Sequence, residues 1–287
     1  MIHGLTTRSY FENQNVTVKR NSAIGGRKND SMWKVWLWLQ PVSYYVSSLF
    51  QEGGFGMSSQ NEILERMFLP SGDSYGTSSF FAGRTGAGKT YLMTEMVNQA
   101  LKAPKFKSTK FIYFSVKQES YWDMPAFNNA DALFQHLQKE QIGIFYPQNP
   151  EEYESELDDI IEMVFELQKE NRKEGWSWTL ILDDVNVLDG FSNTARPSKM
   201  NIKASVAGRS VGVKMVYILH RLGNIPRILN SSLNAGIITA ISPMDNEYSK
   251  KVLSLDLETH YDSLNRNQYS WAFADVYTGD VSLFKAI

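Results

Sequence analysis

A short glycine-rich run between an apolar strand and an amphipathic helix constrains this chain more than any other feature of its sequence. Residues 83–90 read Gly-Arg-Thr-Gly-Ala-Gly-Lys-Thr, the complete pattern G-x-x-x-x-G-K-[ST]. Residues 78–82 before the run are of buried-strand type, and the apolar positions after it, from Leu92 to Leu101, repeat at helical spacing. Strand, loop and helix therefore occur in the order that a phosphate-binding loop requires.

The residue types in this run explain what it can bind. Gly83, Gly86 and Gly88 lack a Cβ, so the backbone can turn with its N–H groups pointing at an anion. Lys89 would reach the β- and γ-phosphates, and Thr90 would hold Mg²⁺ through its hydroxyl. We expect the whole loop to bind the phosphates of ATP or GTP: Gly83, Arg84, Thr85, Gly86, Ala87, Gly88, Lys89 and Thr90.

A second apolar strand, residues 179–182, ends in the carboxylates of Asp183 and Asp184. Ligands bind at the carboxyl edge of a parallel sheet. We expect Asp183 to hold Mg²⁺ together with Thr90, while Asp184 orients or deprotonates the attacking water. The alternative is that the two aspartates only open a turn or cap the next helix.

A third strand, residues 214–219, is flanked by two further candidates. His220 follows it and is a candidate sensor of the γ-phosphate. The alternative is an ordinary histidine at a strand end whose hydrogen bonds are satisfied within the fold. Arg209 precedes the strand, at the end away from its own nucleotide. That position suits action in trans, on the γ-phosphate of a neighbouring subunit, and a surface arginine is the alternative.

From Met57 onward, strand-like runs alternate with amphipathic helical stretches, which predicts an α/β fold with a mostly parallel sheet covered by helices. Further strands are expected at 110–116, 142–146 and 235–241, and a helix with an acidic outer face is expected after Asn149. Strands at 269–274 and 281–284, around the turn 278–280, predict a C-terminal hairpin. We expect a domain over residues 57–287, with an accessory part from about residue 242.

The first 56 residues differ in composition from the rest. They begin polar and then carry an apolar stretch, residues 32–50, which Lys34, Gln40 and Pro41 interrupt. A membrane-spanning helix needs about 20 apolar residues, so a span is not expected here. Three interpretations stay open: a dispensable or over-extended tail, an interfacial membrane anchor, and a segment that docks on a partner.

Composition excludes several classes of protein. The 287 residues are 43% hydrophobic, enough for a full core. The net charge of −2 gives no global attraction to nucleic acid, so any DNA contact must be locally basic. With no cysteine there are no disulfides or thiolate metal sites, and the four histidines are too scattered for a metal-ligand pattern.

From about Ser78 to Ile241 the chain resembles the FtsK/HerA superfamily of DNA-pumping ATPases. The nearest resemblance is to the genome-packaging branch of poxvirus-like large DNA viruses, virophages and tailless membrane-containing phages. The loop at 83–90, the acidic strand end at 180–184 and the segment 207–241 carry this resemblance. Two departures stand out: the family's sensor is usually Gln or Asn where this chain has His220, and its catalytic carboxylate is often Glu where this chain has Asp184.

The resemblance implies a P-loop NTPase fold of the RecA/FtsK-HerA type and a homo-oligomeric ring, a pentamer or hexamer. In such a ring ATP·Mg²⁺ lies at subunit boundaries, and its hydrolysis moves double-stranded DNA into a capsid. The implied catalytic residues are Lys89, Asp184, Arg209 and His220. Capsid or membrane vertex proteins are the implied partners, and the implied location is the cytoplasm of the infected host cell or the packaging vertex of the virion.

Basic residues between the acidic pair and the third strand are candidates for DNA-phosphate contacts: Arg196, Lys199 and Lys203. A solvated surface is the alternative interpretation for each of them. Two other functions stay open for the chain: a helicase or conjugation-type transporter of single strands, and a nucleotide-switched scaffold that pumps nothing. A small-molecule kinase is disfavoured, because paired aspartates at a strand end suit water activation better.

Overall fold

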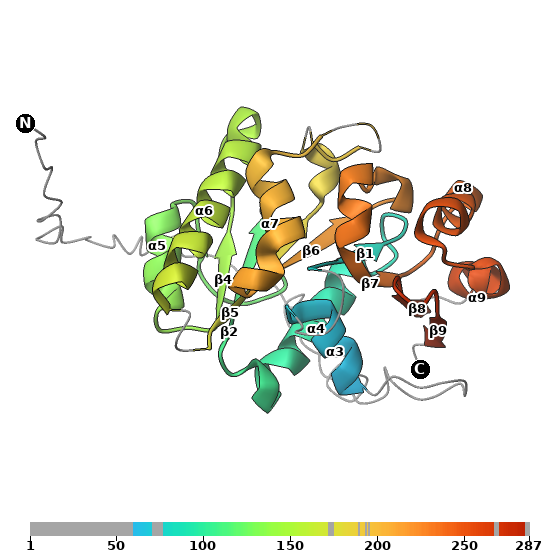
Figure 1. The fold of residues 1–287 in the computed structure, drawn as a ribbon, viewed down its shortest axis with the longest axis horizontal. Helices are drawn as coiled ribbons and strands as arrows, with labels where there is room; N and C mark the ends of the chain where they lie inside the picture. Colours follow the sequence, from blue (N-terminus) through green and yellow to red (C-terminus); the bar gives the residue numbers. More distant parts are fainter. Residues whose placement is uncertain are drawn as a thin grey trace, which may run out of the picture. The chain divides into compact units, whose positions relative to one another are not determined.

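The chain folds around a nine-stranded sheet, and helices cover both of its faces (Figure 1). The computed structural model describes residues 60–70, 77–171, 175–188, 190–192, 194, 196–266 and 270–284. The strand order is β3-β4-β2-β5-β6-β1-β7-β8-β9. The strands are β1 Ser78–Ala82, β2 Thr109–Ser115, β3 Ala126–Phe127, β4 Ile142–Phe145, β5 Ser177–Asp183, β6 Val213–Leu219, β7 Leu233–Ile238, β8 Trp271–Asp275 and β9 Val281–Phe284. The predicted α/β class is confirmed.

Strand pairing brings together the ends of strands that are far apart in the sequence. Strands β1 to β7 pair in parallel, with β6 between β5 and β1 and with β2 on the other side of β5. The carboxyl ends of parallel strands lie at one edge of the sheet. The segments that follow β1, β2, β5 and β6 therefore meet at that edge.

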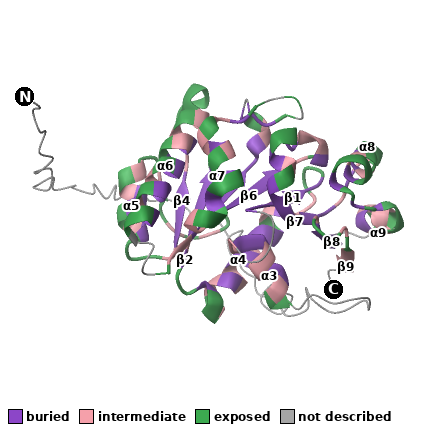
Figure 2. Ribbon diagram, viewed as in Figure 1, coloured by how far each residue is buried: buried purple, intermediate pink, exposed green. Residues whose placement is uncertain are grey.

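Two cores lie on opposite faces of the sheet, because successive side chains of a strand point to opposite sides. Phe80 packs in one core and its neighbour Phe81 in the other. Helices α5 (Ala130–Leu137), α6 (Tyr153–Asn171) and α7 (Lys199–Val211) cover the first face, and α3 (Gln60–Phe68) and α4 (Lys89–Lys102) cover the second. Figure 2 shows buried strands between helices whose outer sides are exposed. This two-sided burial explains why the strands read as continuous apolar runs.

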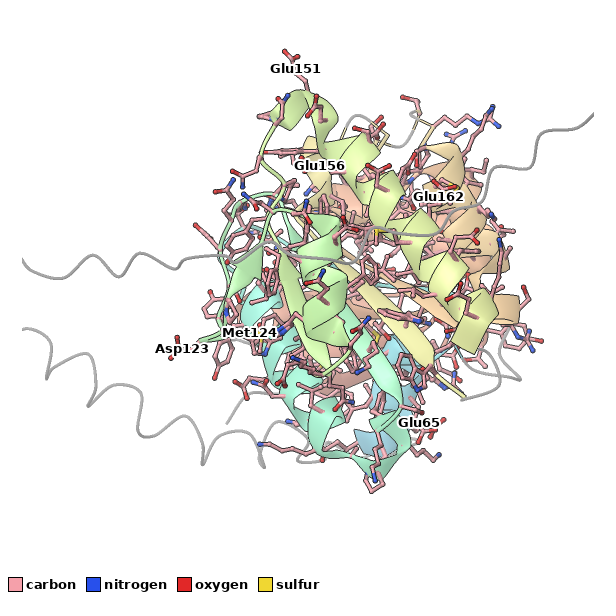
Figure 3. The ribbon with its side chains drawn as sticks, turned by 90° about the vertical axis from the view of Figure 1, so that its left-hand side faces the viewer. Glu65, Asp123, Met124, Glu151, Glu156 and Glu162 are labelled. Atoms are coloured by element: carbon pink, nitrogen blue, oxygen red, sulfur yellow. The ribbon has the colours of Figure 1, made fainter. Side chains whose placement is uncertain are left out.

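Helix α6 carries the predicted row of carboxylates on its solvent-facing side. Glu151, in the short turn before the helix, and Glu162 are exposed, and Glu156 is half-buried. Figure 3 shows these three glutamates spaced along the helix. The opposite side of α6, with Leu157, Ile160 and Val164 among its members, belongs to the core. The helix therefore has the amphipathic pattern expected from its sequence.

A serine caps the start of α7, and two glycines shape its connection to β6. Ser198 caps the start of α7 by accepting a hydrogen bond from the backbone N–H of Asn201, at 3.1 Å. Gly212 ends the helix with φ of 77°, a left-handed conformation that glycine adopts without strain. A Cβ on Gly208 would lie 2.6 Å from the carbonyl oxygen of Val213. Gly208 therefore lets α7 approach the start of β6 closely.

The C-terminal hairpin extends the sheet. Strand β8 pairs antiparallel with β7, and β9 pairs antiparallel with β8 around the predicted turn at 278–280. The predicted hairpin is confirmed. Between β7 and β8 lie α8 (Pro243–Tyr248), a π-helical turn (Ser249–Leu253) and α9 (Tyr261–Arg266), none of which the sequence patterns predicted. Strand β3 and helix α5 were not predicted either.

The extension over residues 1–56, with its apolar stretch, lies outside the described residues, so its three interpretations stay open. Within the described ranges, no helix combines the length and the apolar character that crossing a membrane requires.

Candidate active site

The glycine-rich loop runs from Gly83 to Gly88, between β1 and α4. Gly83 and Gly88 have φ of 149° and 79°. A Cβ on Gly83 would lie 2.0 Å from the hydroxyl oxygen of Thr239, so glycine is required there by both conformation and space. The backbone N–H of Arg84 donates to the carbonyl oxygen of Ala240 at 2.7 Å. The residues that follow β7, Thr239 and Ala240, therefore pack against the start of the loop.

Lys89 is the first residue of α4, and its side chain contacts the loop. Its buried ammonium donates to the carbonyl oxygens of Gly83 and Arg84, both at 2.9 Å. Burial lowers the pKa of Lys89 to about 8. The next residue, Thr90, donates through its hydroxyl to Asp183 Oδ1 at 3.4 Å. The loop and the acidic strand end are therefore in direct contact, as the sequence predicts.

Asp183 is the last residue of β5, and its two oxygens face different partners. Oδ1 accepts from Thr90, and Oδ2 accepts from the phenol of Tyr113 at 2.5 Å. Burial raises the pKa of the Asp183 carboxyl, although the hydrogen bond from Tyr113 opposes the shift. Burial also raises the pKa of Tyr113, which keeps the phenol protonated as a donor. Tyr113 therefore fixes the orientation of Asp183.

Asp184 turns away from its neighbour, because its backbone is left-handed with φ of 55°. Its Oδ1 lies 2.6 Å from His220 Nε2, and its Oδ2 lies 2.6 Å from the ammonium of Lys117. Burial would raise the pKa of Asp184, but hydrogen bonds from Lys117 and Asn186 and the nearby His220 outweigh it, so the pKa lies below its ordinary value. His220 also contacts the loop, with Nδ1 3.2 Å from the hydroxyl oxygen of Thr85. Asp184 is therefore ionised at neutral pH and connected to the loop through His220.

A cavity of about 130 Å³ lies between the loop and the acidic pair, at the carboxyl edge of the sheet. The lining residues are Thr85, Gly86, Gly88, Lys89, Thr90, Lys117, Tyr121, Asp183, Asp184, Ile218, Leu219 and His220.

Oxygen ligands at the cavity fit Mg²⁺. The Thr90 hydroxyl and the Asp183 carboxylate are hard donors, and Mg²⁺ in nucleotide sites uses one or two protein oxygens and completes its shell with phosphates and water. In the described part of the chain, no group of three or more His, Cys, Asp and Glu side chains is arranged as a metal site. A two-ligand site of this kind needs bound phosphate to be complete.

Seven predicted residues lie outside the cavity lining: Gly83, Arg84 and Ala87 of the loop, and Arg196, Lys199, Lys203 and Arg209. Arg209 is exposed on the last turn of α7, at the edge of the sheet opposite the cavity. Arg196 is exposed just before α7, and Lys199 begins that helix. The ammonium of Lys203 lies 4.8 Å from the ring centroid of Phe165. The roles predicted for these four residues in DNA contacts and in trans stay predictions.

Sequence reasoning missed Tyr113 and Lys117, the residues that contact the acidic pair. Tyr113 lies within β2, and Lys117 follows its end. The pairing of Ser115 with Asp183 shows that β2 ends beside β5. A rule that inspects polar residues at the end of every predicted parallel strand would have selected Lys117. Tyr113 carried no such signal, because its contact depends on the strand order.

Comparison with known proteins adds structural relatives. No family model and no curated protein sequence matches the chain. The genome-packaging NTPase B204 from Sulfolobus turreted icosahedral virus 2, in complex with ATP-gammaS, aligns over 75% of this chain and 99% of its own, with a TM-score of 0.57 and 18% identity. The chain has a P-loop NTPase fold. The P-loop NTPase fold is also found in VirB4 of Thermoanaerobacter pseudethanolicus, which aligns over 83% of this chain and 94% of its own with a TM-score of 0.54 and 10% identity.

A third neighbour contains the same P-loop NTPase fold within a longer protein. The cytoplasmic domain of the type VII secretion ATPase EccC from Thermomonospora curvata aligns over 74% of this chain and 25% of its own, with a TM-score of 0.50 and 19% identity. These neighbours confirm the P-loop NTPase fold that the sequence resemblance implied.

Proposed function

We propose that this protein is an ATP hydrolase that moves double-stranded DNA, packaging a viral genome into a capsid. One observation carries the hydrolase part: the loop and the acidic pair line the same cavity, with Thr90 and Asp183 in contact at 3.4 Å. The likeness to a genome-packaging NTPase supports the packaging part.

The residues of the cavity divide the chemistry among them. Lys89 and the loop amides bind the phosphates, and Thr90 and Asp183 hold Mg²⁺. The metal ion supplies charge neutralisation on the phosphates. Asp184, ionised by its hydrogen-bonded neighbours, orients a water molecule and accepts its proton. His220 spans from Asp184 to Thr85 and thereby connects the water-activating group to the loop.

A ring of identical subunits, a pentamer or hexamer, completes this proposal. Arg209 is exposed at the edge of the sheet opposite the cavity, a position that supports action on the nucleotide of another subunit. A guanidinium supplied in trans stabilises charge on the transferring phosphoryl group. Arg196, Lys199 and Lys203 supply phosphate contacts to the duplex, which give affinity without sequence preference. We place the ring in the cytoplasm of the infected cell or at the packaging vertex of the virion, docked on capsid or membrane vertex proteins.

The proposal is tested by measuring ATP turnover with no DNA, with single-stranded DNA and with duplex DNA, alongside the mass of the assembly in solution. We expect magnesium-dependent hydrolysis that duplex DNA stimulates several-fold, together with oligomerisation. Stimulation by single strands alone would support the helicase or conjugation-type alternative. ATP-dependent assembly without DNA stimulation would support a scaffold.

A further inference from the structure

Lys117 is a cation of the cavity that belongs to none of the sequence motifs. It follows β2 in a tight turn, in which the backbone N–H of Gln118 donates to the carbonyl oxygen of Ser115 at 3.2 Å. Gln118 has φ of 56°, and its side-chain amide donates to the carbonyl oxygen of Pro147 at 3.1 Å. This turn holds the backbone of Lys117 at the carboxyl edge of the sheet.

The segment after the turn is held against α4. Trp122 packs edge-on against Tyr113 at 5.2 Å between ring centroids, and its indole N–H donates to Asn98 at 2.9 Å. Tyr121, which lines the cavity, packs edge-on against Tyr91 at 6.1 Å. With the backbone anchored on both sides, the flexible stem of the lysine is the part that can move.

The ammonium of Lys117 occupies one oxygen of the water-activating carboxylate. Lys117 Nζ lies 2.6 Å from Asp184 Oδ2, while His220 occupies Oδ1. The Lys117 side chain is 44% exposed, whereas that of Asp184 is 5% exposed. The lysine therefore reaches in from the open side of the cavity, and its departure would uncover Oδ2 for water.

The charge balance of the cavity favours movement of the Lys117 ammonium toward a bound nucleotide. The cavity lining contains two carboxylates, Asp183 and Asp184, and two lysines, Lys89 and Lys117. A triphosphate carries more negative charge than one Mg²⁺ neutralises, so its arrival adds net negative charge to a balanced cavity. The ammonium of Lys89 is already hydrogen-bonded to the loop, and Lys117 is the other lysine that lines the cavity.

We propose that Lys117 pairs with Asp184 in the nucleotide-free protein and exchanges it for the terminal phosphate when Mg·ATP binds, freeing Asp184 for water. Lys117 thus distinguishes a triphosphate from a diphosphate. This inference rests on the proposed function, since it requires that Mg·ATP binds in this cavity.

The test compares the binding of Mg·ADP with that of the Mg²⁺ complex of a non-hydrolysable ATP analogue by calorimetry. We expect Lys117→Met to weaken analogue binding on the order of tenfold and ADP binding by less than about twofold, because charge-assisted contacts to phosphate are lost only for the triphosphate. Lys117→Arg should restore the ratio of the two affinities. Lys110→Met is the matched control, since Lys110 lies on β2 with its ammonium 5.2 Å from the ring centroid of Trp176.

An unchanged ratio of analogue to ADP affinity in Lys117→Met would overturn the inference. If that variant does not fold, Lys117→Gln provides the same comparison with the same two outcomes. If wild-type protein binds the analogue and hydrolyses ATP, but Lys117→Met leaves the ratio of analogue to ADP affinity unchanged, the result contradicts this inference alone. Wild-type protein that binds neither nucleotide would contradict the proposed function as well.

Discussion

At the scale of single residues, Asp184 shows how backbone conformation gives adjacent aspartates different partners. Its left-handed φ of 55° turns its carboxylate toward Lys117 and His220, while Asp183 faces Thr90 and Tyr113. Asparagine and aspartate tolerate this conformation better than most residues. The proposed metal ligand and the proposed water-activating group can therefore be altered separately.

Asp184→Asn should lower kcat by about 10²- to 10⁴-fold, because it removes the proton acceptor and keeps the side-chain shape. Nucleotide affinity should change only a few-fold, since Asp184 is not among the proposed phosphate or metal ligands. Steady-state hydrolysis and calorimetry measure both quantities. Asp123→Asn, at an exposed carboxylate that Figure 3 labels, is the control. Turnover near the wild-type rate in Asp184→Asn would show that another group activates the water.

Lys214 gives a second prediction at this scale, outside the cavity. Its ammonium is fully buried and donates to Asn234 Oδ1 at 2.6 Å, and burial lowers its pKa to about 7. The unfolded lysine has a pKa of about 10.4, so between these values the unfolded state binds more protons than the folded state. The contribution of Lys214 to the free energy of unfolding therefore rises with pH over this range.

Lys214→Met removes this titration. We expect the stability of the wild type, relative to the variant, to increase by about 2 kcal/mol between pH 7 and pH 9, within the limit of about 1.4 kcal/mol for each pH unit. Urea denaturation of both proteins at the two pH values measures the difference. A constant difference would mean that the buried lysine keeps the same charge in the folded and unfolded states.

At the scale of elements, the packing of α7 against β6 depends on Gly208. Replacing a helical glycine by alanine ordinarily stabilises a helix by about 1 kcal/mol. Here the new Cβ would lie 2.6 Å from a backbone oxygen of Val213, which cannot move without shifting the strand. We expect Gly208→Ala to destabilise the protein by about 1–3 kcal/mol in urea denaturation, the usual cost of overpacking. Ser210→Ala, on the exposed side of α7, is the control, and a stabilised Gly208→Ala would contradict the packing argument.

Periodicity predicted elements well where a segment is apolar and continuous. The strands from β1 to β7 other than β3, as well as α4, α6 and the C-terminal hairpin, were predictable because each buries a regular pattern. Strand β3 has two residues, and α8 and α9 have six each, too short for a pattern to appear. Thr90 and Asp183 could be paired from their motifs. Lys117 could have been selected from its place at the end of a predicted strand, but its contact with Asp184, like that of Tyr113 with Asp183, depends on the strand order that places β2 beside β5.

At the scale of the whole molecule, the proposed ring predicts that a defective subunit impairs its neighbours. Arg209→Ala subunits mixed with wild type in small proportion should lower ATP turnover more than in proportion to their share, because each removes the arginine from another subunit's site. Mixtures at several ratios, assayed after subunit exchange, measure this. Ser210→Ala subunits are the control on the same turn of α7. Strictly proportional loss would show that Arg209 does not act in trans.

The central claim is that the loop at 83–90 and the acidic end of β5 together bind magnesium nucleotide. Calorimetric titration with a non-hydrolysable ATP analogue, with and without Mg²⁺, tests it most directly in wild type, Lys89→Ala and Asp183→Asn. We predict one bound nucleotide for each wild-type chain, loss of binding in Lys89→Ala, and loss of the magnesium dependence in Asp183→Asn. Wild-type protein that takes up no nucleotide, or a Lys89→Ala variant that binds it with unchanged affinity, would contradict the account.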